Sequence, residues 1–273
     1  GTTTPGVEGE FSDSPPRAVR PCELPDGLQV TVLRPGEGRR AQTGDTLLID
    51  YIGVRSEDGT VFDQSYTRGD PIEITLGTGS VIAGWDRGLA GVQQGALVRL
   101  DIPAELAYGD SPSGDIIQPG DALTFITEIR YVLAPVTAAD APRLAVPRSK
   151  GATEVTWQDA IVGDGPALEE GQTALINLMF VRGDNLVVLR SSWANNSPEQ
   201  WVLDLPEEAP DPSAPRLIGL TEGLIGATVG TVRVITMPPE KAYGPEGYQG
   251  EGLPPATDLI VVVEVLGAWG GDD

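Results

Sequence analysis

Residues 88–109 read GLAGVQQGALVRLDIPAELAYG, and residues 223–244 read GLIGATVGTVRVITMPPEKAYG. The two stretches share glycines, strand-forming residues and a terminal Ala-Tyr-Gly at a constant offset of 135 residues. Farther toward the N-terminus, GEGRRAQTGDTLLIDYIGVR (36–55) matches GDGPALEEGQTALINLMFVR (163–182) at an offset of 127. A repeat of this length indicates two related structural units, with about eight residues inserted in the second.

The composition between the matching blocks predicts where each unit begins and ends. The insertion falls at 207–215, which carries three prolines and is expected to be an exposed loop, because proline neither donates to a sheet nor fits inside a helix. An alanine- and proline-rich stretch between the units is typical of an extended linker. The predicted organisation is a flexible tail over 1–26, a first domain over 27–135, a linker over 136–152, a second domain over 153–269 and a short tail over 270–273.

Within each unit the dominant pattern is that of β-strands. Runs rich in β-branched and aromatic residues predict strands in the first domain over 46–52, 96–102 and 123–132. Their counterparts in the second domain are 173–181, 231–237 and 258–266. The best helical candidate of the first domain is 82–91, where Trp85 and Leu89 share one face and Gly91 supplies a stop. We therefore expect an α+β fold in two tandem units.

The charge balance and the missing residue types exclude several classes of function. The chain has 273 residues, of which 40 are Asp or Glu and 18 are Lys or Arg, so its formal net charge is −22. Such a chain repels phosphate backbones and anionic membrane surfaces, and nucleic-acid binding is not expected. Histidine is absent and Cys22 is the only cysteine, which excludes Ser-His-Asp and Cys-His catalysis, zinc clusters and an intramolecular disulfide. We expect no metal and no cofactor.

The N-terminal segment and the apolar runs bear on where the protein works. The longest apolar run, 259–269, is too short to span a bilayer and is interrupted by Glu264, so direct membrane insertion is not expected. Residues 1–26 are rich in Thr, Ser, Pro and Gly and begin with Gly. This favours a processed tail of a secreted or envelope-tethered protein over a cytoplasmic one, although a boundary chosen for expression explains the same start. Cys22 fits either compartment.

Four motifs of the first domain occur in order and together resemble one enzyme family. They are DYIGVRSEDGTVFDQS (50–65), VIAGWDRGL (81–89), AELAYGD (104–110) and IIQPGDALTFITEI (116–129). The chain from residue 27 to 134 is similar, almost without gaps, to the macrolide-binding immunophilins, the FKBP-type peptidyl-prolyl cis-trans isomerases. The resemblance implies a twisted antiparallel sheet wrapped around one short helix, with an apolar aromatic pocket between them that receives a proline ring.

The resemblance also implies which residues form that pocket. The implied catalytic residues are Tyr51, Phe62, Asp63, Trp85, Tyr108 and Phe125. The implied substrate-binding residues are Arg68, Ile72, Val81, Ile82 and Ile117. Two positions depart from the family pattern, since Ile72 stands where an aromatic residue is frequent and Ser113 stands where some members carry histidine. Affinity and sequence preference therefore do not carry over.

The implied chemistry moves no proton and forms no covalent bond. Rotation of an X-Pro amide faces a barrier of about 18–20 kcal/mol, because conjugation is lost in the twisted form. The planar amide is more dipolar than the twisted one, so a dry aromatic pocket favours the twisted form relative to the planar form. By resemblance, Trp85 forms the floor of the ring site, and the Tyr108 hydroxyl and the backbone N–H of Ile82 hold substrate carbonyls.

Taken alone, each of these residues also has a structural interpretation. Tyr51, Phe62 and Phe125 are typical of core aromatics. The resemblance places Asp63 beside the reacting carbonyl, hydrogen-bonded to Tyr51 or paired with Arg68. An aspartate in this place can equally close a turn, and the arginine can neutralise an acidic loop. A shared pocket explains all the positions together, which favours the functional interpretation.

Two other patterns carry less weight. Residues 77–84, GTGSVIAG, resemble a glycine-rich phosphate loop but lack a lysine. Residues 109–115, GDSPSGD, contain carboxylates without the spacing of a calcium loop, and by resemblance they form a mobile lid over the pocket.

The second domain has lost most residues of the implied pocket. The equivalent positions hold Leu178, Leu189, Arg190, Asn195, Leu220 and Val261, whereas Tyr243 survives and Leu253 lies near the place of Ile117. We expect a family-like fold with little or no isomerase activity. The tryptophans expected in its core or at a hydrophobic rim are Trp157, Trp193, Trp201 and Trp269.

The leading functional interpretation is a foldase that isomerises X-Pro bonds in unfolded or flexible polypeptides. Its activity would lie in the first domain, and the second would be accessory, binding substrate or a partner. By resemblance, macrolides fit the same pocket. The alternatives are a non-catalytic chaperone or interaction module that binds proline segments, and a scaffold of two inert domains whose first pocket is occluded.

Overall fold

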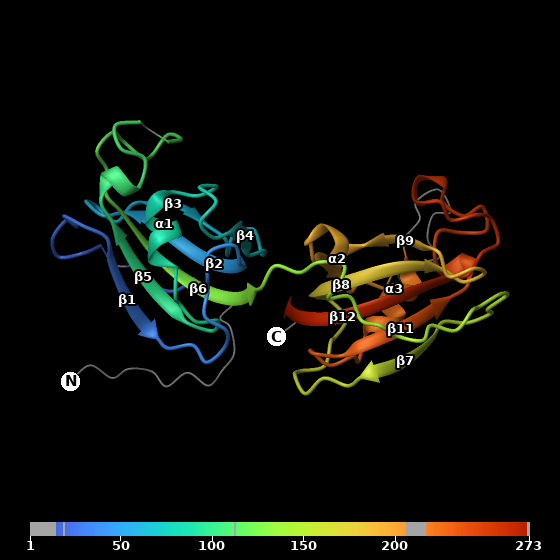
Figure 1. Ribbon diagram of the computed structural model, residues 1–273. Helices are drawn as coiled ribbons and strands as arrows, with labels where there is room; N and C mark the ends of the chain where they lie inside the picture. The colour runs from blue at the N-terminus through green and yellow to red at the C-terminus, as the bar shows by residue number, and fades with distance from the viewer. Residues whose placement is uncertain (1–14, 19, 112, 206–216, 272–273) are drawn as a thin grey trace. The chain divides into compact units, whose positions relative to one another are not determined.

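The computed structural model describes residues 15–18, 20–111, 113–205 and 217–271. The chain divides at residue 135 into two compact units, and each holds one six-stranded sheet with a short helix against it (Figure 1). The strand pairs in both sheets are antiparallel. The predicted fold class, two tandem α+β units, is confirmed. No helix in the described part of the chain has the length and apolar character needed to cross a membrane.

The first unit surrounds a core formed by its helix and the inner face of its sheet. Its elements are β1 (Gln29–Arg34), β2 (Thr46–Arg55), β3 (Val61–Gln64), β4 (Ile72–Thr75), α1 (Ala83–Gly88), β5 (Leu97–Ile102), the 3-10 turn η1 (Ala104–Leu106) and β6 (Leu123–Leu133). The strand order is β1-β5-β6-β2-β3, and β4 also pairs with β2. Central strands β2 and β6 are almost wholly buried, and Trp85 from α1 packs into the same core as they do.

The second unit repeats this arrangement strand by strand around a core of its own. Its elements are β7 (Thr156–Ile161), β8 (Gln172–Arg182), β9 (Val188–Ser191), α2 (Ser192–Asn195), β10 (Glu199–Val202), α3 (Ile218–Leu224), β11 (Val232–Met237), the 3-10 turns η2 (Pro239–Lys241) and η3 (Gln249–Glu251), and β12 (Leu259–Gly270). The order is β10-β8-β12-β11-β7, with β9 also pairing β8. In this order β7 takes the place of β1, and β11 that of β5.

The six long strands and the helix expected from the sequence are present with shifted ends. Strand β2 continues to Arg55, β12 continues to Gly270, and α1 ends at Gly88, before the predicted stop at Gly91. The short strands β1, β3, β4, β7, β9 and β10 were not predicted. Strand β1 is exposed along most of its length and β3 has four residues, so neither carries the buried alternation by which a strand is recognised.

The sheet register supports the equivalence of the two units. Gly53 of β2 lies opposite Phe125, and Phe180 of β8 lies opposite Val261. The turn glycines correspond as well. A Cβ added at Gly36 would lie 2.2 Å from the carbonyl oxygen of Gln94, and one added at Gly163 would lie 2.1 Å from that of Val229. Both turns therefore require glycine because another backbone segment passes too close for a side chain.

The segments predicted as tail and linker make specific contacts where the structure describes them. Arg20 donates a hydrogen bond of 3.0 Å to the carbonyl of Glu57, and Ala18 packs against a small apolar cluster of the first unit, which a free tail would not do. At the end of the predicted linker, the Ser149 hydroxyl and the Ala152 N–H donate to Asp258. The predicted insertion loop at 207–215 lies outside the described residues.

Candidate active site

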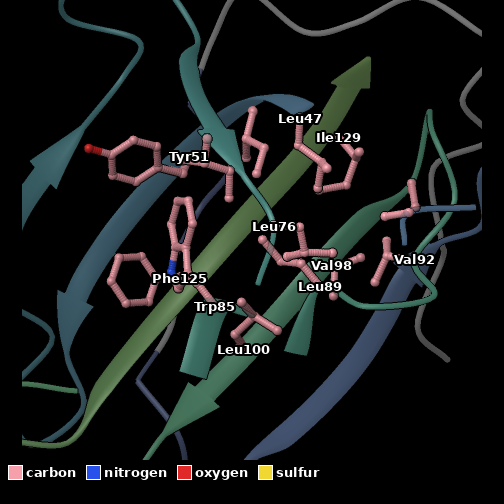
Figure 2. Packing of buried hydrophobic residues seen from close by; sticks show 14 of the residues in the cluster. Leu47, Tyr51, Leu76, Trp85, Leu89, Val92, Val98, Leu100, Phe125 and Ile129 are labelled. Carbon is pink, nitrogen blue, oxygen red and sulfur yellow. The ribbon is translucent and has the colours of Figure 1, made fainter. Parts of the chain in front are cut away.

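Four aromatic side chains from four elements meet at one end of the first unit's core. Tyr51 comes from β2, Phe62 from β3, Trp85 from α1 and Phe125 from β6. Figure 2 shows Tyr51, Trp85 and Phe125 gathered beside the aliphatic part of the core. Ring centroids lie 5.3 Å apart for Tyr51–Trp85, 5.2 Å for Trp85–Phe125 and 5.5 Å for Phe62–Phe125, all edge to face. Such contacts, worth about 0.5–1.5 kcal/mol each, fix the orientation of the rings.

A cavity of about 460 Å³ opens over this cluster. Its volume falls within the range of roughly 300–1,000 Å³ that is common for small-ligand sites. Nine of the residues implied by the sequence line it together, namely Tyr51, Phe62, Asp63, Ile72, Val81, Ile82, Trp85, Tyr108 and Phe125. Trp85 is 4% exposed and Tyr108 is 40% exposed, so the indole forms the floor and the phenol stands at the open side. The cavity is therefore apolar below and polar at its rim.

Two implied residues do not line the cavity, and one lining residue was missed. Ile117 is buried in the core behind it, and Arg68 acts through its contacts with Asp63 and Tyr51. Ser80 also lines the cavity, although the resemblance did not imply it. Its position just before the VIAGW motif was the available signal.

The acid of the cavity is held by a closed triangle of hydrogen bonds. The Tyr51 hydroxyl donates to one carboxylate oxygen of Asp63. Arg68 donates to the other oxygen at 2.7 Å and to the Tyr51 hydroxyl at 3.0 Å. The backbone N–H of Gln64 also donates to Asp63, at 2.8 Å. These bonds leave the carboxylate one fixed orientation beside the aromatic floor.

The same triangle shifts the pKa values of its members. Burial raises the pKa of Tyr51 to about 12, with a further contribution from the hydrogen bond to Asp63. Burial by itself would raise the pKa of Asp63, but the hydrogen bonds from Tyr51 and Arg68 and the charge of Arg68 outweigh it and lower that pKa below its usual value. Asp63 is therefore ionised and Tyr51 protonated at neutral pH.

Two donors at the cavity have no partner in the described part of the chain. Ile82 precedes α1, and its backbone N–H donates to no acceptor there; neither does the hydroxyl of Tyr108. Unpaired donors at the edge of an apolar cavity suit the carbonyl groups of a peptide. None of the described residues in the loop 109–115 lines the cavity.

The equivalent place in the second unit is filled differently. Phe180 stands where the first unit has Gly53, and its side chain is completely buried. Leu178, Leu220 and Val261, at the positions of Tyr51, Trp85 and Phe125, are also fully buried. The aromatic floor is thus replaced by an aliphatic core around one phenyl ring.

The acid of the first unit is replaced by a cation in the second. Arg190 donates to both carboxylate oxygens of Glu199, lies 3.1 Å from Glu251, and places its guanidinium 4.2 Å from the centre of the Phe180 ring. Tyr243, the one surviving pocket residue, donates to Glu251 at 2.9 Å. Burial and the adjacent Glu251 raise the pKa of Tyr243 above its usual value. Unlike Tyr108, this hydroxyl is already engaged.

Beside these residues the second unit has a cavity of its own, of about 490 Å³. It is lined by Arg190, Trp201, Val202, Asp204, Leu217, Ile218, Thr221 and Tyr243. The tryptophans of this unit divide by environment: Trp193 and Trp269 are buried, Trp201 lines the cavity and donates to Thr221, and Trp157 is half exposed. Asn195 lies in α2 and Leu253 in the core; neither lines this cavity.

Comparison with known proteins connects both units to one family. A family model described as FKBP-type peptidyl-prolyl cis-trans isomerase matches residues 37–130 and 171–266. An FK506-binding protein of Streptomyces anulatus is 42% identical over 108 residues, which are 39% of this chain and 87% of that protein. One of Neisseria meningitidis serogroup B is 41% identical over 106 residues, 39% of this chain and 96% of that protein. A solved isomerase of Pseudomonas syringae pv. tomato is 38% identical, with a TM-score of 0.36, over 41% of this chain and 79% of that one.

Proposed function

The chain belongs to the FKBP-type peptidyl-prolyl cis-trans isomerases, and we propose that its catalytic site is the aromatic cavity of the first unit. The observation that carries the proposal is the convergence of nine implied residues on one cavity. Chance placement of core aromatics does not explain why an ionised acid and two unpaired donors lie at the same place. The cavity is open, which argues against a scaffold with an occluded pocket.

In the proposed mechanism the proline ring of the substrate lies on Trp85, enclosed by Tyr51, Phe62 and Phe125. The apolar walls exclude water from the amide, so the dipolar planar form loses more solvation than the twisted form. Lowering the barrier by about 1.4 kcal/mol accelerates the rotation tenfold. No cofactor is required, because rotation about the conjugated amide C–N bond forms no new covalent bond and moves no proton.

The polar groups orient the substrate. We assign the Tyr108 hydroxyl and the Ile82 N–H as donors to substrate carbonyls on either side of the proline. Asp63 lies beside the rotating carbonyl, where its fixed negative charge favours the orientation in which the carbonyl oxygen points away from it. Arg68 is a positioning residue, since it holds Asp63 and Tyr51 in place without lining the cavity.

We assign no isomerase activity to the second unit. Its equivalent site lacks the aromatic floor, carries Arg190 in place of the acid, and has its one tyrosine hydroxyl bound to Glu251. We propose an accessory role in which the cavity beside Trp201 holds a segment of the polypeptide substrate. Holding the chain near the first unit raises the local concentration of its X-Pro bonds.

The natural substrates in this proposal are unfolded or flexible polypeptides that contain proline. The relatives named for binding FK506 make that compound a suitable probe of the first cavity. The composition of residues 1–26 supports action outside the cytoplasm, which fractionation of cells producing the native gene product would test. Recovery in the cytoplasm alone would contradict that location.

The decisive test is a protease-free isomerisation assay on an X-Pro peptide, in which the same change is made at equivalent positions of the two units. We expect Tyr108→Phe to lower kcat/KM roughly 3- to 10-fold, the value of one hydrogen bond. Tyr243→Phe is the matched control and should leave kcat/KM unchanged. Equal losses in both variants would contradict the assignment of activity to the first unit.

The second candidate function is binding without turnover. The observation that favours it is that the unpaired donors at the cavity rim, Ile82 N–H and the Tyr108 hydroxyl, suffice to hold a ligand. This candidate predicts that the chain binds FK506 at the first cavity, quenching Trp85 fluorescence, while the peptide isomerises at its uncatalysed rate. In that case the cavity is a recognition site and the protein a proline-binding chaperone or interaction module.

A further inference from the structure

Strand β1 of the first unit borders an apolar groove that is separate from the proposed catalytic cavity. As an edge strand β1 pairs with β5 only, and within the described residues its outer side receives no backbone hydrogen bond. Next to it lies a cavity of about 300 Å³ between β1 and the end of α1. We call it the β1 groove; its apolar lining is Val30, Val32, Pro35, Ala90, Val92 and Ala96.

Two valines of the groove are largely exposed to solvent. Val30 is 44% exposed and Val32 is 56% exposed, and the alternation of a strand places both on the same face. Beneath them, Val92 and Ala96 are buried and form the floor. An edge strand with free backbone groups and exposed valines is a template for the addition of another strand.

The charges around the groove identify what kind of strand fits. Residues 27–135 contain eight arginines. Six of them form ion pairs: Arg34, Arg39, Arg55, Arg68, Arg99 and Arg130. The other two, Arg40 and Arg87, have no carboxylate partner among the described residues, and both line the β1 groove. Within the described residues the Arg40 side chain makes one hydrogen bond, of 3.1 Å, to the carbonyl of Gly91. Two unpaired cations beside an apolar floor complement a segment that carries carboxylates.

In the second unit the same place is closed by the chain itself. Trp157 of β7 lies opposite Ile235, as Val30 of β1 lies opposite Leu100. The Trp157 ring lies 5.5 Å from the guanidinium of Arg233, and Asp159 accepts two hydrogen bonds from that guanidinium at 2.6 and 3.0 Å. In the second unit an aromatic ring and a carboxylate from β7 therefore occupy the face that Val30 and Val32 leave exposed in the first unit.

The unpaired arginines are also particular to the first unit. By the repeat offsets, Arg40 corresponds to Ala167 and Arg87 to Glu222, and Glu222 is paired with Lys241 at 2.6 Å. The two unpaired arginines are thus not a consequence of the fold, because the second unit has the same strand order with Ala167 and Glu222 in their places.

We propose that the β1 groove binds an extended, acidic segment of another protein, which adds as a strand to β1. Backbone hydrogen bonds to residues 29–32 would supply affinity, and alternate apolar side chains would face Val30 and Val32. Carboxylates of the segment would pair with Arg40 and Arg87. The bulge between Val32 and Arg34 ends the pairing on one side and so defines the register.

The test uses the full chain and a fluorescein-labelled peptide of seven alternating valine and glutamate residues, followed by fluorescence anisotropy. We expect saturable binding that weakens at least tenfold in Val32→Glu and in Arg87→Glu. The matched controls are Val188→Glu, a similarly exposed valine on β9, and Arg148→Glu, an exposed arginine of the second unit that precedes β7; both should bind as the parent does. A peptide with lysine in place of glutamate should bind at least tenfold more weakly.

Amide chemical shifts decide where the peptide lies. The proposal expects changes at residues 29–32 and 87–91, and exchange protection of the β1 amides. It is overturned by absence of saturable binding, by equal binding of the lysine peptide, or by shifts confined to the Trp85 cavity. It is also overturned if the chain dimerises through this face, with Val32→Glu restoring the monomer. We expect Val32→Glu and Arg87→Glu to unfold at the parent's temperature and to isomerise the X-Pro peptide at the parent's rate. Loss of peptide binding in these variants is then separate from loss of fold or of the proposed activity.

Discussion

The position held by Gly53 in the first unit and by Phe180 in the second explains why only the first unit has an aromatic floor. A Cβ added at Gly53 would lie 2.6 Å from the Phe62 ring and 2.8 Å from the Phe125 ring, so these two rings need the glycine. In the second unit Phe180 takes this position, opposite Val261 and Arg190, and the positions of Phe62 and Phe125 hold Leu189 and Val261. The aromatic floor and a side chain at this point exclude each other by volume.

The first prediction at the residue scale concerns Gly53→Ala. We expect it to lower the free energy of unfolding of the first unit by about 1–3 kcal/mol and to reduce kcat/KM, because the methyl group must displace Phe62 or Phe125. Urea unfolding and the peptide assay measure the two effects. Gly27→Ala is the control, since no atom lies within 4 Å of the Cβ it would add. Parent-like behaviour of Gly53→Ala would refute the packing argument.

The second residue-scale prediction concerns pH. The pKa of Asp63 lies below that of an ordinary carboxyl group, and the pKa of Tyr51 is about 12. Neither Asp63 nor Tyr51 therefore titrates between about pH 5 and pH 9, and the chain has no histidine. We expect kcat/KM to be flat over that range. Because the pKa of Asp63 is lower in the folded state than in the unfolded state, ionised Asp63 adds to the stability of the first unit. This added stability is fully present above the ordinary carboxyl pKa and is lost as the pH falls through the folded pKa. A bell-shaped profile centred near neutrality would contradict this account.

At the scale of elements, a buried serine fastens the hairpin that carries the acid of the first cavity. The Ser65 hydroxyl accepts from the backbone N–H of Tyr51 at 2.9 Å and donates to Asp50 at 2.6 Å. In the second unit Ser192 accepts from the N–H of Leu178 at 2.9 Å and donates to Asn177 at 3.1 Å. The second unit keeps this pair of serine hydrogen bonds although it lacks the aromatic cavity. The serine therefore serves the fold of both units.

We predict that Ser65→Ala destabilises the first unit by about 1–3 kcal/mol, because it leaves the backbone N–H of Tyr51 without its partner and removes one hydrogen bond from the buried carboxylate of Asp50, which keeps its ion pair with Arg130. It should also lower kcat/KM, since Tyr51 loses the bond that fixes its backbone. Ser192→Ala should destabilise the second unit alone and leave peptide turnover unchanged. Calorimetry and the peptide assay on both variants make the comparison. Loss of turnover in Ser192→Ala would mean that the second unit contributes to the chemistry.

At the scale of the whole molecule, the proposal assigns isomerisation to the first unit and substrate holding to the second. The first has an open aromatic cavity with an acid, and the second has a cavity of similar volume with Arg190 and Trp201. In this proposal a short peptide substrate needs only the first unit. A polypeptide long enough to occupy both sites gains from the second through effective concentration.

We therefore predict that Trp201→Ala lowers the rate on a proline-limited refolding protein severalfold and leaves the rate on a short X-Pro peptide unchanged. Trp157→Ala is the matched control, because this half-exposed tryptophan lies outside that cavity. The measurement is the ratio of the two rates for each variant. An unchanged ratio in Trp201→Ala would end the proposal of an accessory role at this cavity.

The sequence by itself determined the repeat, the α+β class and the family, because glycine spacing, strand periodicity and motif order are local properties of the chain. It also named nine residues that line one cavity, although only through resemblance. It missed Ser80 and the short edge strands such as β1 and β3, which have too few buried residues to show a period.

Only the tertiary structure decided how side chains from distant segments meet. Asp63, Tyr51 and Arg68 form their triangle across two strands and a loop, and their pKa shifts follow from burial and distance, which no spacing rule contains. The exclusion of Phe62 and Phe125 by a side chain at position 53 is likewise a matter of packing volume. Contacts of this kind depend on close packing in three dimensions, and for that reason they become visible only when the chain is folded.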